Sequence, residues 1–223
     1  MSMKIWLLRH GQPDWYPDDR GQNDPGLTEL GHVQARQAAE RLVGEVDEVW
    51  VSPAVRAQQT AAPLLEVTGL AGRTLPWLME LRTPDYTGRS EAEVREMLGG
   101  ARFRDRDAWW QGLPGGGDAK EWVDRIAGGL DAELAQLGLA RDEDIWRGER
   151  VPRSIAMVCH AGTSGVVTSH LLGVHQVPWA WFRFGLMHAG LCSLTTVAMS
   201  DGRVFALRRF NDLEHLAPAQ RTY

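Results

Sequence analysis

Two stretches of the chain, residues 5–8 and 154–159, are apolar at nearly every position, with no alternation of polar and apolar side chains. Continuous apolar runs of this length are typical of β-strands that are covered on both faces of a sheet. Both runs therefore predict strands at the centre of an α/β fold. The other predicted strands are residues 47–51, 74–77, 191–197 and 203–207.

Between these strands, apolar side chains recur at helical spacing. In one such segment Trp122, Ile126, Leu130 and Leu134 fall on one stripe of a helix. Residues 139–153 are polar and charged and are predicted to form a loop. The predicted helices cover residues 28–44, 54–66, 90–99, 118–137 and 161–172.

Capping and breaking residues mark the ends of these helices. Thr28 is a good N-cap, and Ser90 begins a capping-box pattern. Ser52 and Pro53 predict an N-cap followed by the first helical residue. Pro63 should kink or end the helix that contains it.

The order of strands and helices predicts one α/β domain over residues 1–223. We expect a three-layer sandwich, with a mostly parallel central sheet and helices on both faces. The turn signal Asp201-Gly202 predicts a hairpin between the last two strands. Residues 89–117 are charged and irregular and are predicted to be a small lid excursion over the sheet edge.

Composition narrows the functional classes. The chain has 223 residues and a net charge of −5, which argues against a general nucleic-acid surface. No apolar run approaches the ~18 residues of a membrane span, and the start of the chain does not resemble a signal peptide. We therefore expect a cytoplasmic protein that binds neither nucleic acid nor membrane, with self-association left open. Cys159 and Cys192 form neither a disulfide framework nor a zinc pattern.

Each of the two apolar runs leads directly into a histidine. Arg9, His10 and Gly11 follow the first run, and His160 follows the second. Open α/β sheets bind ligands at the carboxyl ends of their strands. Arginine matches phosphate oxygens with its planar fork, and a neutral histidine can attack phosphorus. The sequence therefore predicts a phosphate site at this edge.

Two further residues can serve the same site. Arg56 falls in the first turn of a predicted helix, where its side chain can reach the carboxyl edge of the sheet. Glu80 lies between apolar neighbours, so it is either exposed on a turn or placed in a cleft. Burial there would raise the pKa of Glu80 and suit it to acid–base catalysis.

The motifs together resemble the histidine phosphatase superfamily, the phosphoglycerate-mutase-like proteins. The resemblance covers nearly the whole chain in the same order. The residues that carry it are Arg9-His10-Gly11, Asn23-Asp24-Pro25-Gly26-Leu27-Thr28, Ser52-Pro53 with Arg56-Ala57-Gln58-Gln59-Thr60-Ala61, Glu80 before a turn at Gly88, and Cys159-His160-Ala161-Gly162.

The resemblance implies a role for each matched residue. His10 would be the nucleophile that becomes phosphorylated, and Arg9, Arg56 and His160 would line the phosphate pocket. Glu80 would protonate the leaving oxygen and then activate water. No metal and no other cofactor is implied. The substrate-binding residues expected from the resemblance are Arg9, Gly11, Gln22, Asn23, Arg56 and Thr163.

Two positions depart from the family pattern. Tyr16 stands where the family often has an asparagine that touches the phosphate, so Gln22 or Asn23 could make that contact instead. Residues 84–88 replace the family's common Gly-Asp-Trp-Glu-Gly turn, which alters the pocket wall more than the chemistry.

The sequence thus predicts a metal-independent phosphomonoesterase that acts through phosphohistidine on a small phosphorylated metabolite. The alternatives are phosphoglycerate-mutase-type phosphoryl transfer and a non-catalytic phospho-ligand binding protein on the same fold. A mutase needs extra cations and a closed lid, whereas residues 89–117 are rich in both signs of charge and Asp14, Asp18 and Asp19 add acids at the entrance. Hydrolysis is therefore expected over transfer. Candidate walls of the substrate pocket are Trp15, Tyr16, Trp109, Trp110, Trp179, Trp181 and His188.

Two other chemistries fit the sequence less well. A cysteine phosphatase built on Cys159 would need an arginine six positions later, where the chain has Gly165. A zinc site at His10, His160 and His188 would lack a closely spaced ligand pair and would lie beside arginines that repel a cation.

Overall fold

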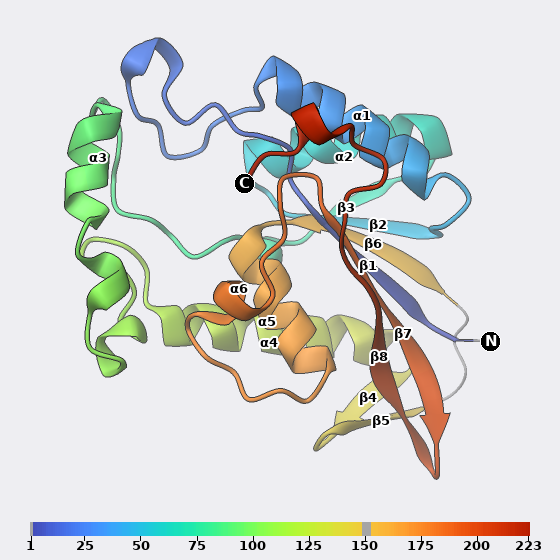
Figure 1. Cartoon of the computed structure of the whole chain (residues 1–223). Helices are drawn as coiled ribbons and strands as arrows, with labels where there is room; N and C mark the ends of the chain where they lie inside the picture. Colours follow the sequence, from blue (N-terminus) through green and yellow to red (C-terminus); the bar gives the residue numbers. More distant parts are fainter. Residues whose placement is uncertain (1, 149–152) are drawn as a thin grey trace.

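A computed structural model describes residues 2–148 and 153–223 of the chain. The described residues form one eight-stranded sheet with the strand order β3-β2-β6-β1-β7-β8-β5-β4 (Figure 1). Its strands are β1 (Lys4–Arg9), β2 (Glu48–Val51), β3 (Gly72–Thr74), β4 (Leu139–Asp142), β5 (Ile145–Gly148), β6 (Ser154–Cys159), β7 (Leu191–Met199) and β8 (Gly202–Asp212).

The sheet is mixed, so the prediction of a mostly parallel sheet is wrong. Three neighbouring pairs, among β3, β2, β6 and β1, are parallel, and four pairs from β1 to β4 are antiparallel. The β7–β8 hairpin adds an antiparallel half to the parallel strands. β8 also pairs with β5, so a second hairpin, β4–β5, extends the sheet. This hairpin lies within residues 139–153, which were predicted to form a loop. Only Leu139 and Trp146 of that hairpin are buried, so its sequence lacks a strand pattern.

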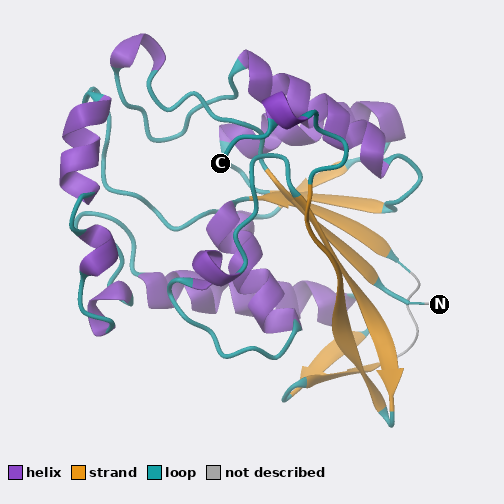
Figure 2. Cartoon of the chain, viewed as in Figure 1, coloured by secondary structure: helices purple, strands orange, loops and turns teal. Residues whose placement is uncertain are grey.

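Helices cover both faces of the sheet and complete three layers (Figure 2). α1 (Glu29–Leu42) and α2 (Val55–Thr68) lie on one face, and α4 (Ala119–Gln136) and α5 (Ala161–Leu171) lie on the other. β1 serves both cores, because Trp6 and Leu8 pack with α1 and α2 while Ile5 and Leu7 pack with α4 and α5. Burial on both faces explains the continuous apolar run. No helix in the two described ranges is long and apolar enough to cross a membrane.

The helix starts agree with the sequence except at α2. Thr28 caps α1 by accepting from the Gly31 N–H, and Ser90 forms a full capping box at the start of α3 (Glu91–Leu98). α2 begins at Val55 with Ala54 as N-cap, and the Ser52 hydroxyl lies closer to His160 Nε2, at 2.7 Å, than to the Ala54 N–H, at 3.4 Å. The same helix continues through Pro63 to Thr68. The strand predicted at residues 74–77 lies earlier, at 72–74, because residues 76–78 form a turn of 3-10 helix.

The segment 89–117 forms an excursion away from the sheet, which contains α3 and two turns of 3-10 helix (Figure 1). Backbone hydrogen bonds tie its start to the loop that follows β1. The Gly21 N–H donates to the Arg89 carbonyl at 2.7 Å, and the Gly88 N–H donates to the Gly21 carbonyl at 2.9 Å. α6 (Ala180–Arg183) is a single turn before β7.

Candidate active site

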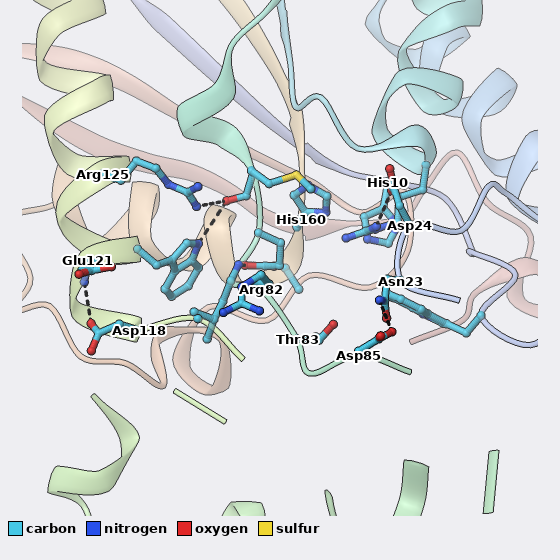
Figure 3. Close-up of a pocket in the computed structure, with 18 of the residues that line it drawn as sticks. His10, Asn23, Asp24, Arg82, Thr83, Asp85, Asp118, Glu121, Arg125 and His160 are labelled. Carbon is cyan, nitrogen blue, oxygen red and sulfur yellow. Dashed lines mark hydrogen bonds and ion pairs between the residues drawn. The ribbon is translucent and has the colours of Figure 1, made fainter. Parts of the chain in front are cut away.

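The two predicted strand-end histidines meet at the carboxyl edge of the sheet. β1 and β6 are parallel neighbours in which Arg9 is paired with Cys159, so His10 and His160 follow at the same level. Their ring centroids are 5.3 Å apart, and both side chains are buried beside a cavity (Figure 3). The register of two strands therefore builds the centre of the site.

A hydrogen bond fixes which nitrogen of the His10 ring carries the proton. His10 Nδ1 lies 2.8 Å from the Gly11 carbonyl, which accepts its proton and leaves Nε2 with a lone pair. Burial, followed by electrostatic interaction with His160 and with the Arg56 cation, holds the pKa of His10 well below its usual value. His10 is thus a neutral imidazole with an unprotonated Nε2. Gly11 itself packs against α1, since a Cβ there would lie 2.5 Å from the Gly31 carbonyl oxygen.

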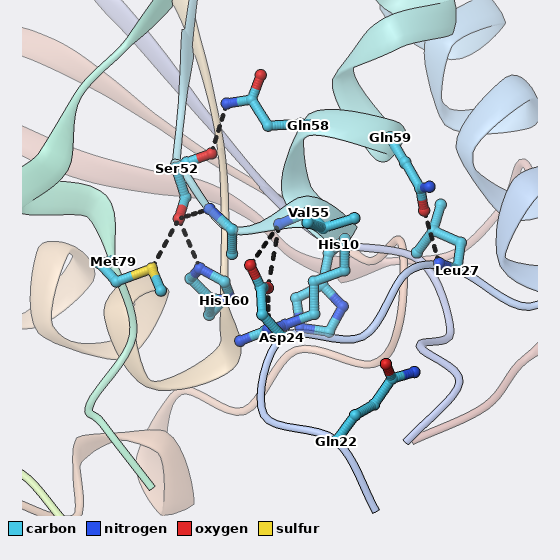
Figure 4. A network of polar contacts seen from close by, with 12 residues as sticks. His10, Gln22, Asp24, Leu27, Ser52, Val55, Gln58, Gln59, Met79 and His160 are labelled. Atoms are coloured by element: carbon cyan, nitrogen blue, oxygen red, sulfur yellow. Dashed lines mark hydrogen bonds and ion pairs between the residues drawn. The ribbon is translucent and has the colours of Figure 1, made fainter. Parts of the chain in front are cut away.

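His160 is oriented by Ser52. The Ser52 hydroxyl lies 2.7 Å from His160 Nε2 (Figure 4). When that hydroxyl donates to Nε2, the proton of the neutral imidazole resides on Nδ1. His160 Nδ1 is buried and has no partner within the described protein. In that tautomer, His160 Nδ1 can donate a hydrogen bond to a bound group.

Two arginines complete the basic wall, Arg56 buried and Arg9 partly buried. Arg56 is only 5% exposed, and its Nη1 lies 3.3 Å from the Asp24 carboxylate. Burial lowers the pKa of Arg9 to about 10, so it remains a cation near neutral pH. The Nε atoms of Arg9 and Arg56 are buried without partners in the described chain. Buried donors are normally satisfied, so these atoms are able to donate to an acceptor in the cavity.

Glu80 reaches the same cavity from the loop after β3. Its Oε2 accepts from the Gly162 N–H at 2.8 Å and its Oε1 accepts from its own neighbour, the Leu81 N–H, at 3.0 Å. Burial raises the pKa of Glu80, although these donors and Arg56 act in the opposite direction. A carboxyl group with a raised pKa retains its proton to higher pH and suits general acid catalysis.

Gly162 holds the position of this acid, which gives a first prediction. A Cβ at Gly162 would lie 2.6 Å from Glu80 Oε1, so Gly162→Ala must displace the carboxyl group. We expect kcat on an alkyl phosphate to fall roughly 10- to 100-fold, since small misplacements of a catalytic group are costly. Gly128→Ala is the matched control, because a Cβ there meets nothing within 4 Å. Equal rates for the two variants would contradict this role of Gly162.

The site opens into a cavity of about 830 Å³. Of the predicted site residues, Arg9, His10, Asn23, Arg56, Glu80 and His160 line it, whereas Gly11, Gln22 and Thr163 do not. No site role was predicted for the other polar side chains on its wall. These are Asp24, Arg82, Thr83, Asp85, Asp118, Glu121, Trp122 and Arg125.

The residues proposed to replace the missing asparagine contact are engaged elsewhere. Gln22 Nε2 donates to the Asp14 carbonyl at 2.8 Å. Asn23 lines the cavity, but its amide donates to Asp85 at 2.6 Å and its oxygen accepts from the Tyr86 N–H. Tyr16 lies in a different hollow, beside α3. Trp15 is the predicted aromatic that lines the cavity, with the Arg56 guanidinium 5.1 Å from its ring centroid.

The geometry also bears on the three alternatives, a cysteine phosphatase, a zinc site and a non-catalytic binding protein. Burial raises the pKa of Cys159 to about 12, so a thiolate nucleophile is disfavoured. In residues 2–148 and 153–223, no three His, Cys, Asp or Glu side chains converge as a metal-binding group. Glu80 lies at the cavity, whereas the non-catalytic alternative would be favoured by a remote position.

A neutral histidine beside two arginines, with a carboxyl group at the same cavity, is the arrangement expected of a phosphoryl-transfer site on an α/β fold. The family model of the histidine phosphatase superfamily (branch 1) matches residues 5–213. The chain therefore belongs to the histidine phosphatase superfamily, and it is a phosphatase.

Individual relatives agree with this assignment. A glucosyl-3-phosphoglycerate phosphatase of Mycobacterium tuberculosis is 35% identical over 183 residues, which cover 80% of this chain and 79% of the relative. A solved structure of a mycobacterial glucosyl-3-phosphoglycerate phosphatase superposes with a TM-score of 0.71 at 30% identity, covering 95% of this chain and 99% of that one. A 2,3-bisphosphoglycerate-dependent phosphoglycerate mutase of Bartonella quintana is 36% identical, but over only 44% of this chain and 52% of the mutase.

Proposed function

We propose that the chain hydrolyses a small phosphomonoester through a phosphohistidine formed on His10. The observation that carries the proposal is the set of three buried donors without partners, on Arg9, Arg56 and His160. A phosphate group supplies acceptor oxygens and negative charge to all three. The two arginines act on the transferring phosphoryl group as preorganised positive charge.

The reaction divides into two steps. In the first, His10 Nε2 attacks phosphorus, the phosphorus–oxygen ester bond breaks, and the leaving oxygen takes the proton of Glu80. In the second, the Glu80 carboxylate accepts a proton from water as the water oxygen attacks phosphorus. The phosphorus–nitrogen bond then breaks, which releases inorganic phosphate and restores neutral His10 and protonated Glu80.

The pKa shifts predict the pH profile of this reaction. Glu80 must begin protonated, and burial raises its pKa, so activity on an alkyl phosphate should persist above the usual range of a carboxyl group and decline as pH rises through that raised pKa. His10 must begin neutral, and its lowered pKa should retain activity in mildly acidic solution. Steady-state kinetics across pH test this. A rate that rises with pH throughout the range would contradict the acid role.

The far wall of the cavity favours a polar leaving group. Arg82 and Arg125 offer cations there, and Asp118 and Glu121 offer carboxylates that accept from hydroxyl groups. A leaving group that carries hydroxyl groups and an acid fits this mixture. Because relatives of this chain include glucosyl-3-phosphoglycerate phosphatases, glucosyl-3-phosphoglycerate is the first substrate to test.

The experiment measures release of inorganic phosphate from glucosyl-3-phosphoglycerate, 3-phosphoglycerate, glycerol 3-phosphate and p-nitrophenyl phosphate. Hydrolysis of at least one alkyl ester, lost in His10→Ala, supports the proposal. A second arm supplies 3-phosphoglycerate with a little 2,3-bisphosphoglycerate. Appearance of 2-phosphoglycerate without inorganic phosphate would favour the mutase reaction instead.

A further inference from the structure

The loop that precedes β7 contacts the guanidinium group of Arg9. Its Nη1 donates to the Leu186 carbonyl at 2.6 Å, and its Nη2 lies 3.1 Å from His188 Nε2. His188 is only 5% exposed, and its ring centroid is 5.8 Å from that of His10. The two contacts occupy one edge of the guanidinium group and leave Nε without a protein partner.

The contact with Arg9 determines the tautomer of His188. Because a guanidinium group only donates hydrogen bonds, His188 Nε2 must be the acceptor and the proton must lie on Nδ1. Nδ1 is 2.9 Å from the Thr222 hydroxyl oxygen, and the His188 backbone N–H donates to the Thr222 carbonyl at 3.0 Å. Burial and Arg9 lower the pKa of His188 to about 3, which agrees with a neutral ring.

Gln34 of α1 fixes Thr222 in turn. The side chain of Gln34 is fully buried, and its Nε2 donates to the Thr222 hydroxyl at 3.0 Å and to the Gln220 carbonyl at 2.7 Å. Its Oε1 accepts from the Gln12 N–H at 2.7 Å. The hydrogen bonds therefore form a chain that starts two residues after His10, passes through α1 and residues 220–222, and ends on Arg9.

We propose that His188 is a positioning residue for Arg9, and that Thr222 and Gln34 hold it in the tautomer that accepts from the arginine. The inference rests on the proposed function. With Nη1 and Nη2 both held along one edge, the planar guanidinium group has one orientation. Its remaining donors are then aimed before the phosphate binds. Such preorganisation removes the cost of ordering the arginine during binding and reaction.

The first experiment distinguishes the loss of the Nε2 acceptor of His188 from the loss of its buried ring. His188→Phe retains a buried ring but removes Nε2, whereas His188→Gln restores an acceptor oxygen of similar reach. For His188→Phe we expect kcat/KM to fall, and the inhibition constant of orthovanadate to rise, by roughly 10- to 100-fold, the worth of a hydrogen bond to a charged group. His188→Gln should recover most of both losses. Thr222→Val should show a smaller loss in the same direction, and Thr222→Ser should reverse it.

His215→Phe is the matched control. His215 Nε2 lies 3.0 Å from the Ala189 carbonyl, so this histidine contacts the same loop without touching Arg9. We expect its orthovanadate affinity to be unchanged, with thermal unfolding measured for every variant. A loss in His215→Phe equal to that in His188→Phe would overturn the proposal, because it would show a general loosening of the loop.

A double-mutant cycle tests whether His188 acts through Arg9. Orthovanadate binding is measured by titration calorimetry in the wild type, His188→Phe, Arg9→Ala and the double variant. If His188 acts by orienting Arg9, its substitution should have no further effect once Arg9 is absent. Equal losses in both backgrounds would overturn the proposal. This arm measures binding alone, so it is independent of whether turnover passes through phosphohistidine. Trapping of a labelled phosphoenzyme, as described in the Discussion, tests that step separately.

Discussion

His10→Ala is expected to lose all phosphoenzyme and nearly all turnover. Removal of a covalent nucleophile costs roughly 10⁴-fold or more in kcat, and Nε2 of each of the two neighbouring buried imidazoles has a protein partner. His160 Nε2 faces Ser52, and His188 Nε2 faces Arg9. The measurement mixes enzyme with a ³²P-labelled phosphomonoester and quenches the mixture rapidly. Wild-type protein should carry label that is labile in acid and stable in alkali.

The control for this experiment is a histidine away from the site. His32→Ala, on α1, should retain both label and turnover, because His32 does not line the cavity. Label that persists in His10→Ala would exclude His10 as the nucleophile. Turnover that persists without any label would instead favour direct attack by water.

Glu80→Gln is expected to distinguish substrates by their leaving groups. General acid catalysis contributes about 10²- to 10⁴-fold, so hydrolysis of an alkyl phosphate should slow by that factor. An aryl phosphate such as p-nitrophenyl phosphate needs little protonation of its leaving oxygen and should slow much less in the first step. Glutamine preserves the shape of the side chain and its acceptor oxygen for the Gly162 N–H. Burst kinetics on both substrates separate formation of the phosphoenzyme from its hydrolysis.

The same variant should also change the pH profile. In Glu80→Gln the decline of the first step at high pH should disappear, because the group whose burial raises its pKa is gone. An equal loss on alkyl and aryl substrates, with the pH profile of phosphoenzyme formation unchanged, would remove Glu80 from the role of acid.

The centre of the site could be predicted from the sequence because it depends on local order. An apolar strand followed by a histidine occurs at Arg9-His10 and at Cys159-His160, and parallel pairing of the two strands brings the histidines together. Glu80 depends on longer-range packing, and its position was expected from the resemblance to a family. The family match confirms that resemblance.

Other parts of the molecule depend on contacts that a sequence pattern does not contain. Trp122 falls on the apolar stripe of α4, yet it also lines the cavity, and its Nε1 donates to the Met79 carbonyl at 3.3 Å. Arg125, one turn later, donates to the same carbonyl at 2.7 Å. Ser52 has the sequence of a helix cap, and its hydroxyl accepts from the Ala54 N–H at 3.4 Å, but it also contacts His160 at 2.7 Å. In each case, packing between distant elements determined the side chain's partner.

Because β7 is antiparallel to β1, residues reach this edge of the sheet in two ways. The residues that follow the parallel strands β1 and β6, including the two histidines, lie at the edge where these strands end. β7 runs in the opposite direction, with Leu191 paired to Leu8, so it begins at the edge where β1 ends. It delivers the residues that precede it, including Leu186 and His188. A protein engineer can therefore vary the segment before β7 to adjust the grip on Arg9 while leaving the parallel strands and their histidines unaltered.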